Sequence, residues 1–168
     1  MFSGQKGNYI EKDNPDPVDL YGRSKLLGEV HGEHCLTLRT SIIGRELQTK
    51  YGLIEWFLSQ KSKAVKGFSR AIYTGFTTQV LAEIIANVIE QHPDLSGLWH
   101  VSSDPISKYD LLHLVNQAFQ LDITIERDEA FVCDRSLDSS RFRQATGYQP
   151  PTWSEMITQL AHERKEMS

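Results

Sequence analysis

The stretch Asp19-Leu-Tyr-Gly-Arg-Ser-Lys-Leu-Leu-Gly-Glu29 places a phenol and an ammonium, Tyr21 and Lys25, four residues apart. Asp19 suits the positive end of a helix dipole, so we predict a helix from about Asp19 to Gly32. Side chains four residues apart on a helix lie on one face. A nearby ammonium stabilises the phenolate of a tyrosine, whose ordinary pKa of about 10 is too high for proton transfer near neutrality. The pair therefore has the composition of a general acid or base at a carbonyl or alcohol.

The residues around this pair strengthen that interpretation, because a tyrosine and a lysine four residues apart also occur by chance as an ordinary aromatic and a solvated charge. Gly22, Ser24 and Gly28 all lower helix propensity, and a glycine costs about 1 kcal/mol relative to alanine. Close approach of another backbone or of a ligand would explain such small residues.

In this context the stretch closely resembles the active-site helix of extended short-chain dehydrogenase/reductases. It resembles most the branch typified by dTDP-4-dehydrorhamnose reductase. Further matching segments are Phe2-Ser-Gly4, Tyr9-Ile-Glu11, Pro15-Asp-Pro17, Leu38-Arg-Thr-Ser-Ile-Ile-Gly44 and, less sharply, Phe76-Thr-Thr78. The resemblance implies an α/β fold: the C-terminal part of a Rossmann-like doubly wound sheet plus a small α/β substrate-binding region. We expect one compact unit, with residues 1–62 ending the Rossmann-like domain and residues 63–168 binding substrate.

The resemblance also implies roles for individual residues. Tyr21 would give a proton to the keto oxygen of the substrate, and Lys25 would hold the hydroxyls of the nicotinamide ribose, so that both also contact the cofactor. The third catalytic residue of the family is a Ser or Thr before the position of Phe2. Ser3 is the nearest hydroxyl, but its register does not match.

A second group of site residues follows from the apolar, β-branched run Cys35–Ile43, which predicts a buried parallel strand. Ligands of doubly wound folds lie beyond the carboxyl ends of such strands. Thr40, Ser41 and Ile42 are therefore predicted to meet the cofactor ring.

Phe2, Glu11 and Arg141 are predicted to contact substrate, Arg141 through charge-assisted hydrogen bonds to a diphosphate, although a surface arginine is the commoner case. Two departures from the family bear on the substrate. A Trp is typical where Ile42 stands, and a Pro-Thr pair where Thr77-Thr78 stands. The substrate is therefore expected to be a nucleotide-linked sugar that need not carry rhamnose chemistry.

A Gly-rich turn from strand to helix, which binds pyrophosphate in this fold, is missing from the sequence. Gly4 and Gly7 neither follow a predicted strand nor precede a predicted helix. We expect the chain to be the C-terminal part of a longer reductase that uses NADPH or NADH, and not to bind either by itself. A sheet without its first strands exposes an edge, which a second copy could cover.

Composition excludes several partners. The 168 residues carry a net charge of -4 with both signs mixed along the chain, which disfavours nucleic acid and anionic membranes. No apolar run approaches the roughly 20 residues of a membrane span, and a cytoplasmic location is expected. Cys35 and Cys133 are expected to be reduced thiols. His31-x-x-His34-Cys35 falls short of the about four ligands of a structural zinc site, so no metal is predicted.

Three functions remain open. The first is NAD(P)-dependent reduction of a nucleotide-linked 4-keto sugar. The second is an epimerase or dehydratase of the same superfamily, which would add an acid or base that Asp16 and Asp19 do not clearly supply. The third is a non-catalytic binding or regulatory subunit, in which the missing Ser or Thr and the missing Gly-rich turn would reflect lost turnover.

Periodicity and capping signals predict the remaining elements. Ser107 and Asp110 form a capping-box pattern, and Gly147 closes a short helix. The predicted helices span 51–62, 79–91 after a cap at Thr77 or Thr78, 107–119, 138–147 and 153–165. The predicted strands span 64–68, 98–102 and 123–126.

Overall fold

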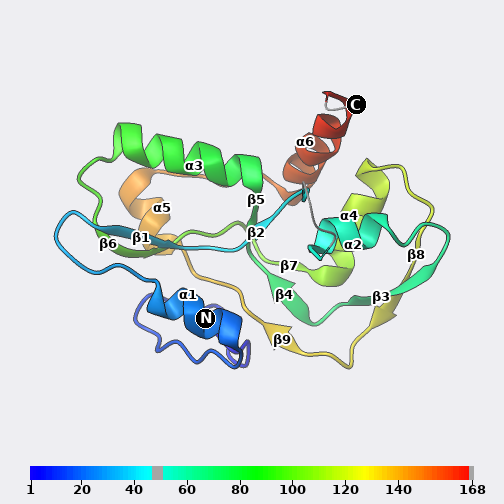
Figure 1. Cartoon of the computed structure of the whole chain (residues 1–168), viewed down its shortest axis with the longest axis horizontal. Coiled ribbons are helices and arrows are strands. Elements are labelled where there is room, and N and C mark those ends of the chain that lie inside the picture. The colour runs from blue at the N-terminus through cyan, green and yellow to red at the C-terminus, as the bar shows by residue number, and fades with distance from the viewer. Residues whose placement is uncertain (47–50, 167–168) are drawn as a thin grey trace.

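The computed structural model describes residues 1–46 and 51–166, which form a mixed α/β structure in two halves (Figure 1). One half contains α1 (Leu20–Leu27), β1 (Leu36–Arg39), α3 (Thr78–Gln91), β6 (Gly97–His100) and α5 (Ser140–Thr146). The other contains α2 (Leu53–Leu58), β3 (Ala64–Phe68), α4 (Lys108–Ala118), β8 (Thr124–Asp128) and α6 (Trp153–Glu166). Short strands lie between them: β2 (Ile42–Ile43), β4 (Ala71–Tyr73), β5 (Phe76–Thr77), β7 (Ile106–Ser107) and β9 (Cys133–Asp134).

Parallel strand pairs joined through helices confirm the predicted α/β class. β1 pairs with β6, β2 with β5, and β3 with β8, all in parallel. β4 lies between β7, which is antiparallel to it, and β9, which is parallel. Figure 1 shows α3 and α1 on opposite sides of the β1–β6 pair, as in a doubly wound sheet.

The strand predicted over residues 35–43 is divided in the structure into β1 and β2. The Arg39 carbonyl still accepts from the Val101 amide at 2.9 Å, next to β6, whereas the Ser41 carbonyl accepts from the Phe76 amide at 2.9 Å, next to β5. The chain therefore changes its pairing partner at Thr40, which interrupts the ladder. The strands β4, β7 and β9, of two or three residues each, are too short to give a periodic signal, and they were not predicted.

Helix ends follow the predicted capping with two differences. The Asp19 carboxylate accepts from the Gly22 amide at 2.6 Å, but α1 ends at Leu27 instead of near Gly32, because Gly28 caps it. Ser107 accepts from the Asp110 amide at 3.0 Å and donates to its carboxylate at 2.6 Å, as the capping-box pattern predicts. Thr77 stands at the start of α3 but makes no side-chain cap.

A single apolar core joins the two halves. It continues from α3 through β6 to α4 and α6, and its fully buried members include Phe57, Phe76, Leu111, Met156 and Leu160. Elements from both sides of residue 62 share this core, since β1 pairs with β6. The division at residue 62 is therefore a functional proposal, and in space the two segments interleave.

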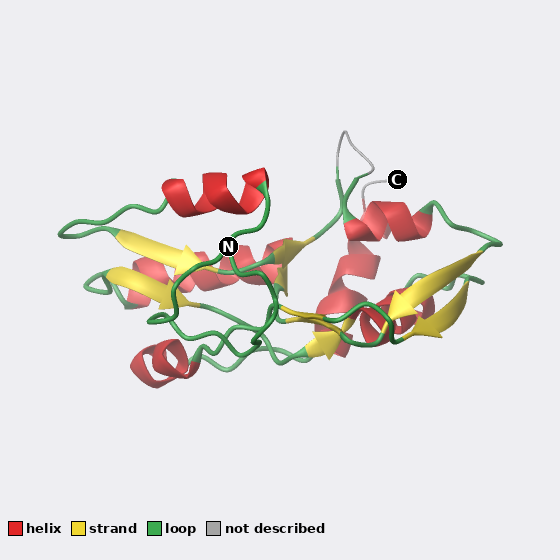
Figure 2. Ribbon diagram, turned by 90° about the horizontal axis from the view of Figure 1, so that it is seen from below, coloured by secondary structure: helices red, strands yellow, loops and turns green. Residues whose placement is uncertain are grey.

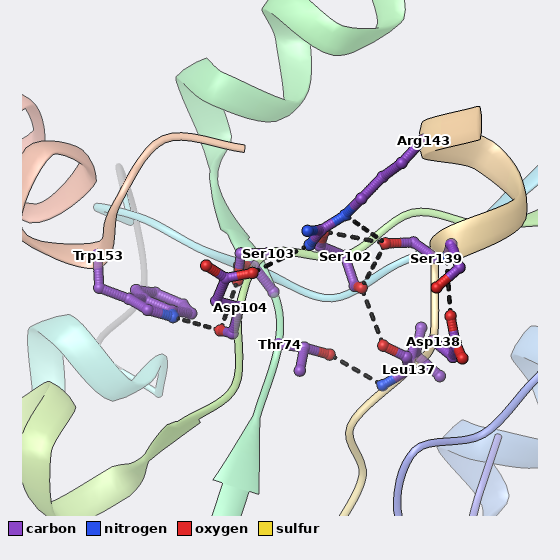
Figure 3. Close-up of polar contacts among 11 residues, drawn as sticks. Thr74, Ser102, Ser103, Asp104, Leu137, Asp138, Ser139, Arg143 and Trp153 are labelled. Carbon is purple, nitrogen blue, oxygen red and sulfur yellow. Dashed lines mark hydrogen bonds and ion pairs between the residues drawn. The ribbon is translucent and has the colours of Figure 1, made fainter. Parts of the chain in front are cut away.

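A polar network fixes the loops where the halves meet (Figure 3). Arg143 donates to the Ser102 carbonyl at 3.1 Å and to the Asp104 carboxylate at 3.2 Å. The Ser102 hydroxyl donates to the Leu137 carbonyl at 2.9 Å, and the Trp153 indole donates to the Asp104 carbonyl at 2.7 Å. These bonds hold the segments after β6 and after β9 against α5 and α6.

Several apolar residues in and around α1, and one in β2, are exposed. They are Val18, Leu20, Leu27, Val30 and Ile42. β1 pairs with β6 and with no other strand among residues 1–46 and 51–166, and Figure 2 shows α1 standing apart from the sheet on this side. Coverage of this surface by a second copy stays a prediction. No helix in the described part of the chain is long and apolar enough to cross a membrane.

Candidate functional site

The two residues that prompted the enzymatic interpretation lie together at the rim of a cleft. The Lys25 ammonium nitrogen is 5.3 Å from the centroid of the Tyr21 ring. The Tyr21 side chain is 71% exposed, and both residues line a cleft of about 620 Å³. The phenol is therefore accessible to a ligand in this cleft, with the ammonium beside it.

The predicted cofactor residues Thr40, Ser41 and Ile42 line the same cleft. These residues lie where the chain stops pairing with β6 and begins to pair with β5. The break between β1 and β2 therefore brings them to the cleft. The Ile42 side chain is 54% exposed there. The structure thus brings together all five residues predicted from the active-site helix and the strand end, although their contact with a cofactor stays a prediction.

Gly22 explains how the N-terminal segment comes close to this helix. A Cβ atom at Gly22 would lie 3.0 Å from Pro17 Cβ and 3.4 Å from the backbone nitrogen of Met1. The predicted close approach of another backbone is therefore found at this glycine. At Gly28 a Cβ atom would meet only carbonyls of the helix itself, at 3.4 Å or more.

A buried ion pair ties the end of α1 to the sheet. Arg39 of β1 donates to the Glu29 carboxylate at 2.6 and 2.9 Å, and each side chain is only 5% exposed. The Arg39 guanidinium also lies 5.6 Å from the centroid of the Phe2 ring, which forms part of the cleft. Glu29 follows α1 by two residues, so this pair positions Tyr21 and Lys25 relative to the strand end.

His100 completes this buried cluster as a neutral ring. Its Nδ1 lies 2.9 Å from the Tyr9 carbonyl and its Nε2 lies 3.4 Å from a guanidinium nitrogen of Arg39. Because a carbonyl only accepts and a guanidinium only donates, Nδ1 carries the proton and Nε2 accepts. Protonation at Nε2 would turn an N–H group toward the guanidinium.

We expect acid to destabilise the protein through His100. Burial lowers the pKa of His100 and Arg39 acts in the same direction, while the Tyr9 carbonyl, Glu11 and Asp13 oppose the shift. The ring stays neutral in the folded state, whereas the unfolded chain takes up a proton near pH 6.5, so stability is complete above about pH 6.5 and falls below it. Urea unfolding between about pH 8 and 5 measures this. A His100→Gln variant should be less stable at high pH and lose less stability on acidification; equal losses would contradict the assignment.

Of the three predicted substrate residues, Phe2 lines the cleft and the other two lie elsewhere. Phe2 is only 5% exposed and stacks on Tyr9 with the ring centroids 4.1 Å apart, so little of it is open to a ligand. Glu11 accepts from the His100 amide at 3.1 Å. Arg141 donates to the Leu98 carbonyl at 2.8 Å.

Arg141 also stacks over the Trp99 ring at 3.6 Å and lies 3.8 Å from the Glu11 carboxylate. Neither Glu11 nor Arg141 is among the described residues that line the cleft with Tyr21. The structure gives both side chains partners on β6 and does not bring them to Tyr21.

Ser3 and the two N-terminal glycines have structural surroundings of their own. The Ser3 hydroxyl donates to the Asp16 carboxylate at 2.5 Å, which does not favour it as a substitute for the missing catalytic hydroxyl. Gly4 and Gly7 have positive φ values of 89° and 72° and pack against β9, where a Cβ on Gly7 would lie 2.3 Å from the Asp134 carboxylate. The turn that contains both glycines is thus packed against the rest of the protein.

A second cleft, of about 550 Å³, adjoins the first on the side of α4. The two clefts share Ser41, Ile42, Tyr73 and Arg135 as lining residues. Tyr73 and Arg135 escaped prediction because they belong to, or directly follow, strands too short to detect. The Arg135 guanidinium makes no ion pair or side-chain hydrogen bond within the part of the chain that the structure describes, which leaves it available to an anion in either cleft.

Metal-binding groups do not accompany these clefts. No three His, Cys, Asp or Glu side chains gather in a metal-binding arrangement anywhere within residues 1–46 and 51–166. His31 and His34 are exposed near the helix end.

Comparison with known proteins gives a family and a fold. The family described as RmlD substrate binding domain matches residues 1–165. Methionine adenosyltransferase 2 subunit beta of Danio rerio is 28% identical over 134 residues, which are 72% of this chain and 41% of that protein. The chain therefore spans less than half the length of this curated relative.

Solved structures agree on the fold. A hypothetical dTDP-4-dehydrorhamnose reductase from Sulfolobus tokodaii is 30% identical with a TM-score of 0.73, over 90% of this chain and 58% of that one. A dTDP-4-dehydrorhamnose reductase from Clostridium acetobutylicum has a TM-score of 0.81 at 19% identity, over 98% of this chain and 62% of that one. One from Bacillus anthracis, solved in complex with NADP, has a TM-score of 0.78 at 19% identity, over 96% and 62%.

Proposed function

The chain belongs to the RmlD substrate binding domain family, and we propose that it supplies the catalytic helix and the substrate site of an NAD(P)-dependent reductase of nucleotide-linked 4-keto sugars. The observation that supports this most directly is the exposed Tyr21 phenol with the Lys25 ammonium beside it at the cleft. In this proposal residues 1–62 provide the catalytic helix and strand end, and residues 63–168 bind most of the substrate.

The residues at the cleft fit the nicotinamide end of such a cofactor. Lys25 has three N–H donors for ribose hydroxyls, and the exposed Ile42 side chain offers an apolar surface beside the polar Thr40 and Ser41. When bound, the cofactor supplies a hydride to the keto carbon. The chain's own contribution is a proton: Tyr21 donates it to the keto oxygen, and Lys25 stabilises the phenolate that remains.

The second cleft is suited to the nucleotide end of the substrate. Arg135 stands on the border of the two clefts, and Lys108 at the start of α4 lines the second one. Both cations can form charge-assisted hydrogen bonds with a diphosphate, while the keto sugar reaches Tyr21. Arg135 takes the role that the sequence had suggested for Arg141.

Calorimetry on the 168-residue chain tests whether it binds the substrate but not the cofactor. We expect binding of dTDP-linked sugars but no measurable binding of NADPH or NADH, because the sequence has no Gly-rich phosphate turn. Micromolar binding of either cofactor would show that our placement of the cofactor site is wrong. Turnover is tested by NADPH and NADH oxidation with a nucleotide-linked 4-keto sugar, using a form of the protein that binds the cofactor.

The alternative of an epimerase or dehydratase receives no support from the residues near Tyr21. Such an enzyme needs a further acid or base, but the Asp19 carboxylate caps α1 through the Gly22 amide. Hydrogen bonds from Ser3 occupy Asp16 and lower the pKa of its carboxyl. Both carboxylates have partners other than a substrate.

A non-catalytic subunit is a second candidate, favoured by one observation. The relative from Danio rerio is named as a subunit of another enzyme. A protein of this kind would bind its ligand without turnover and would co-purify with a larger partner. Turnover that depends on Tyr21 would exclude this candidate.

A further inference from the structure

Tyr73 stands where the two clefts meet. It lies at the end of β4 and lines both clefts. The residue is partly exposed, yet its hydroxyl oxygen is buried and has no hydrogen-bond partner within the described residues. A ligand in the clefts would therefore contact Tyr73 through its ring and not through its hydroxyl.

The surroundings of Tyr73 hold this ring in place. The hydroxyl lies against Gly75, where a Cβ atom would be only 2.0 Å from the phenolic oxygen, so that only glycine leaves room for it. On another side the ring packs on Trp153, with the centroids 5.6 Å apart and the planes at 47°. Trp153 is itself fixed by its indole hydrogen bond to the Asp104 carbonyl (Figure 3). The ring is thus a preformed surface.

The chemistry of Tyr73 favours packing over acid–base work. Burial raises the pKa of its hydroxyl, so the ring stays neutral. Ile42, which is shared by the same two clefts, adds an exposed apolar side chain, whereas Arg135 supplies the positive charge at this border. A ligand that spans the junction therefore meets an apolar surface next to a cation.

We propose that the Tyr73 ring is the platform on which the hexose of the nucleotide sugar lays its C–H face, placing the keto carbon toward Tyr21 and the diphosphate toward Arg135. This inference rests on the proposed function. A hexose linked to a nucleoside diphosphate matches the order of surfaces, since its ring carries an apolar face and its phosphates carry the charge. Aromatic residues are the usual apolar surfaces of ligand pockets.

Two variants at this position separate the ring from the hydroxyl. Tyr73→Phe keeps the ring, so its affinity for dTDP-L-rhamnose should stay within about twofold of wild type. Tyr73→Leu removes the ring and should weaken the binding of dTDP-L-rhamnose about tenfold. The affinity for dTDP, which lacks the hexose, should change less than about threefold. Titration calorimetry on the 168-residue chain gives both affinities, and thermal unfolding verifies that each variant is folded.

An NMR measurement on wild type covers a Leu variant that fails to fold, and a double variant adds a further test where the Leu variant does fold. In wild type, NMR should show upfield ring-current shifts of the hexose protons of bound dTDP-L-rhamnose. Adding Ile42→Trp to Tyr73→Leu should restore part of the affinity, because it returns a ring to the same junction.

The outcomes separate this inference from the function on which it rests. If wild type binds dTDP-L-rhamnose but the Leu variant binds it equally well, or the Phe variant loses as much as the Leu variant, the platform is overturned and the proposed function stands. Equal losses for dTDP, or no ring-current shifts in wild type, also overturn it. If wild type binds neither dTDP-L-rhamnose nor dTDP, the expected binding of dTDP-linked sugars is overturned, and the platform with it.

Discussion

Replacing Tyr21 with Phe is expected to lower kcat by about 10²- to 10⁴-fold in a form of the protein that reduces a nucleotide-linked 4-keto sugar, because it removes the proton donor to the keto oxygen. The side chain is mostly exposed and packs little, so the free energy of unfolding should hardly change. Steady-state kinetics and urea unfolding on the same preparation measure the two effects.

Tyr51 offers a matched control for this substitution. It is a second tyrosine with a highly exposed side chain, and it lines neither cleft. Tyr51→Phe should leave kcat unchanged. Undiminished turnover in Tyr21→Phe would remove the phenol from the mechanism and would favour a different proton donor at the cleft.

The parts of the site that depend on local spacing were predictable from the sequence. Tyr21 and Lys25 meet because four residues make one helical turn, and α1 forms with Asp19 as its cap. The strand over residues 35–43 was found for a similar reason, since its apolar run is long enough to read. Its break into β1 and β2 was not found, because the break is caused by a change of pairing partner from β6 to β5.

The parts that depend on tertiary contacts were not predictable. Arg141 was proposed for a diphosphate on its charge alone, and the structure places it over Trp99 instead. Arg135 and Tyr73 reach the junction of the clefts through β9 and β4, whose two and three residues show no periodicity. A cation or a ring in such a strand has no sequence signal that separates it from an ordinary surface residue.

The buried ion pair behind α1 leads to the second large effect. Arg39→Leu should lower the free energy of unfolding by about 3–5 kcal/mol, because it leaves the Glu29 carboxylate buried without its partner. The variant also removes the donor to Nε2 of His100. Urea unfolding measures the change. Lys66→Met, which breaks the exposed pair with Asp128, is the matched control and should change stability far less.

A double variant distinguishes a paired charge from simple loss of packing. Glu29→Leu combined with Arg39→Leu removes both charges, so it should be more stable than Arg39→Leu alone. If instead the double variant loses as much stability as the Glu29→Leu and Arg39→Leu single variants taken together, the two charges are not coupled. The anchoring of α1 through Glu29 is then wrong. Because Glu29 lies just after the helix that carries Tyr21, Arg39→Leu should also reduce kcat in a form that turns over, whereas Lys66→Met should not.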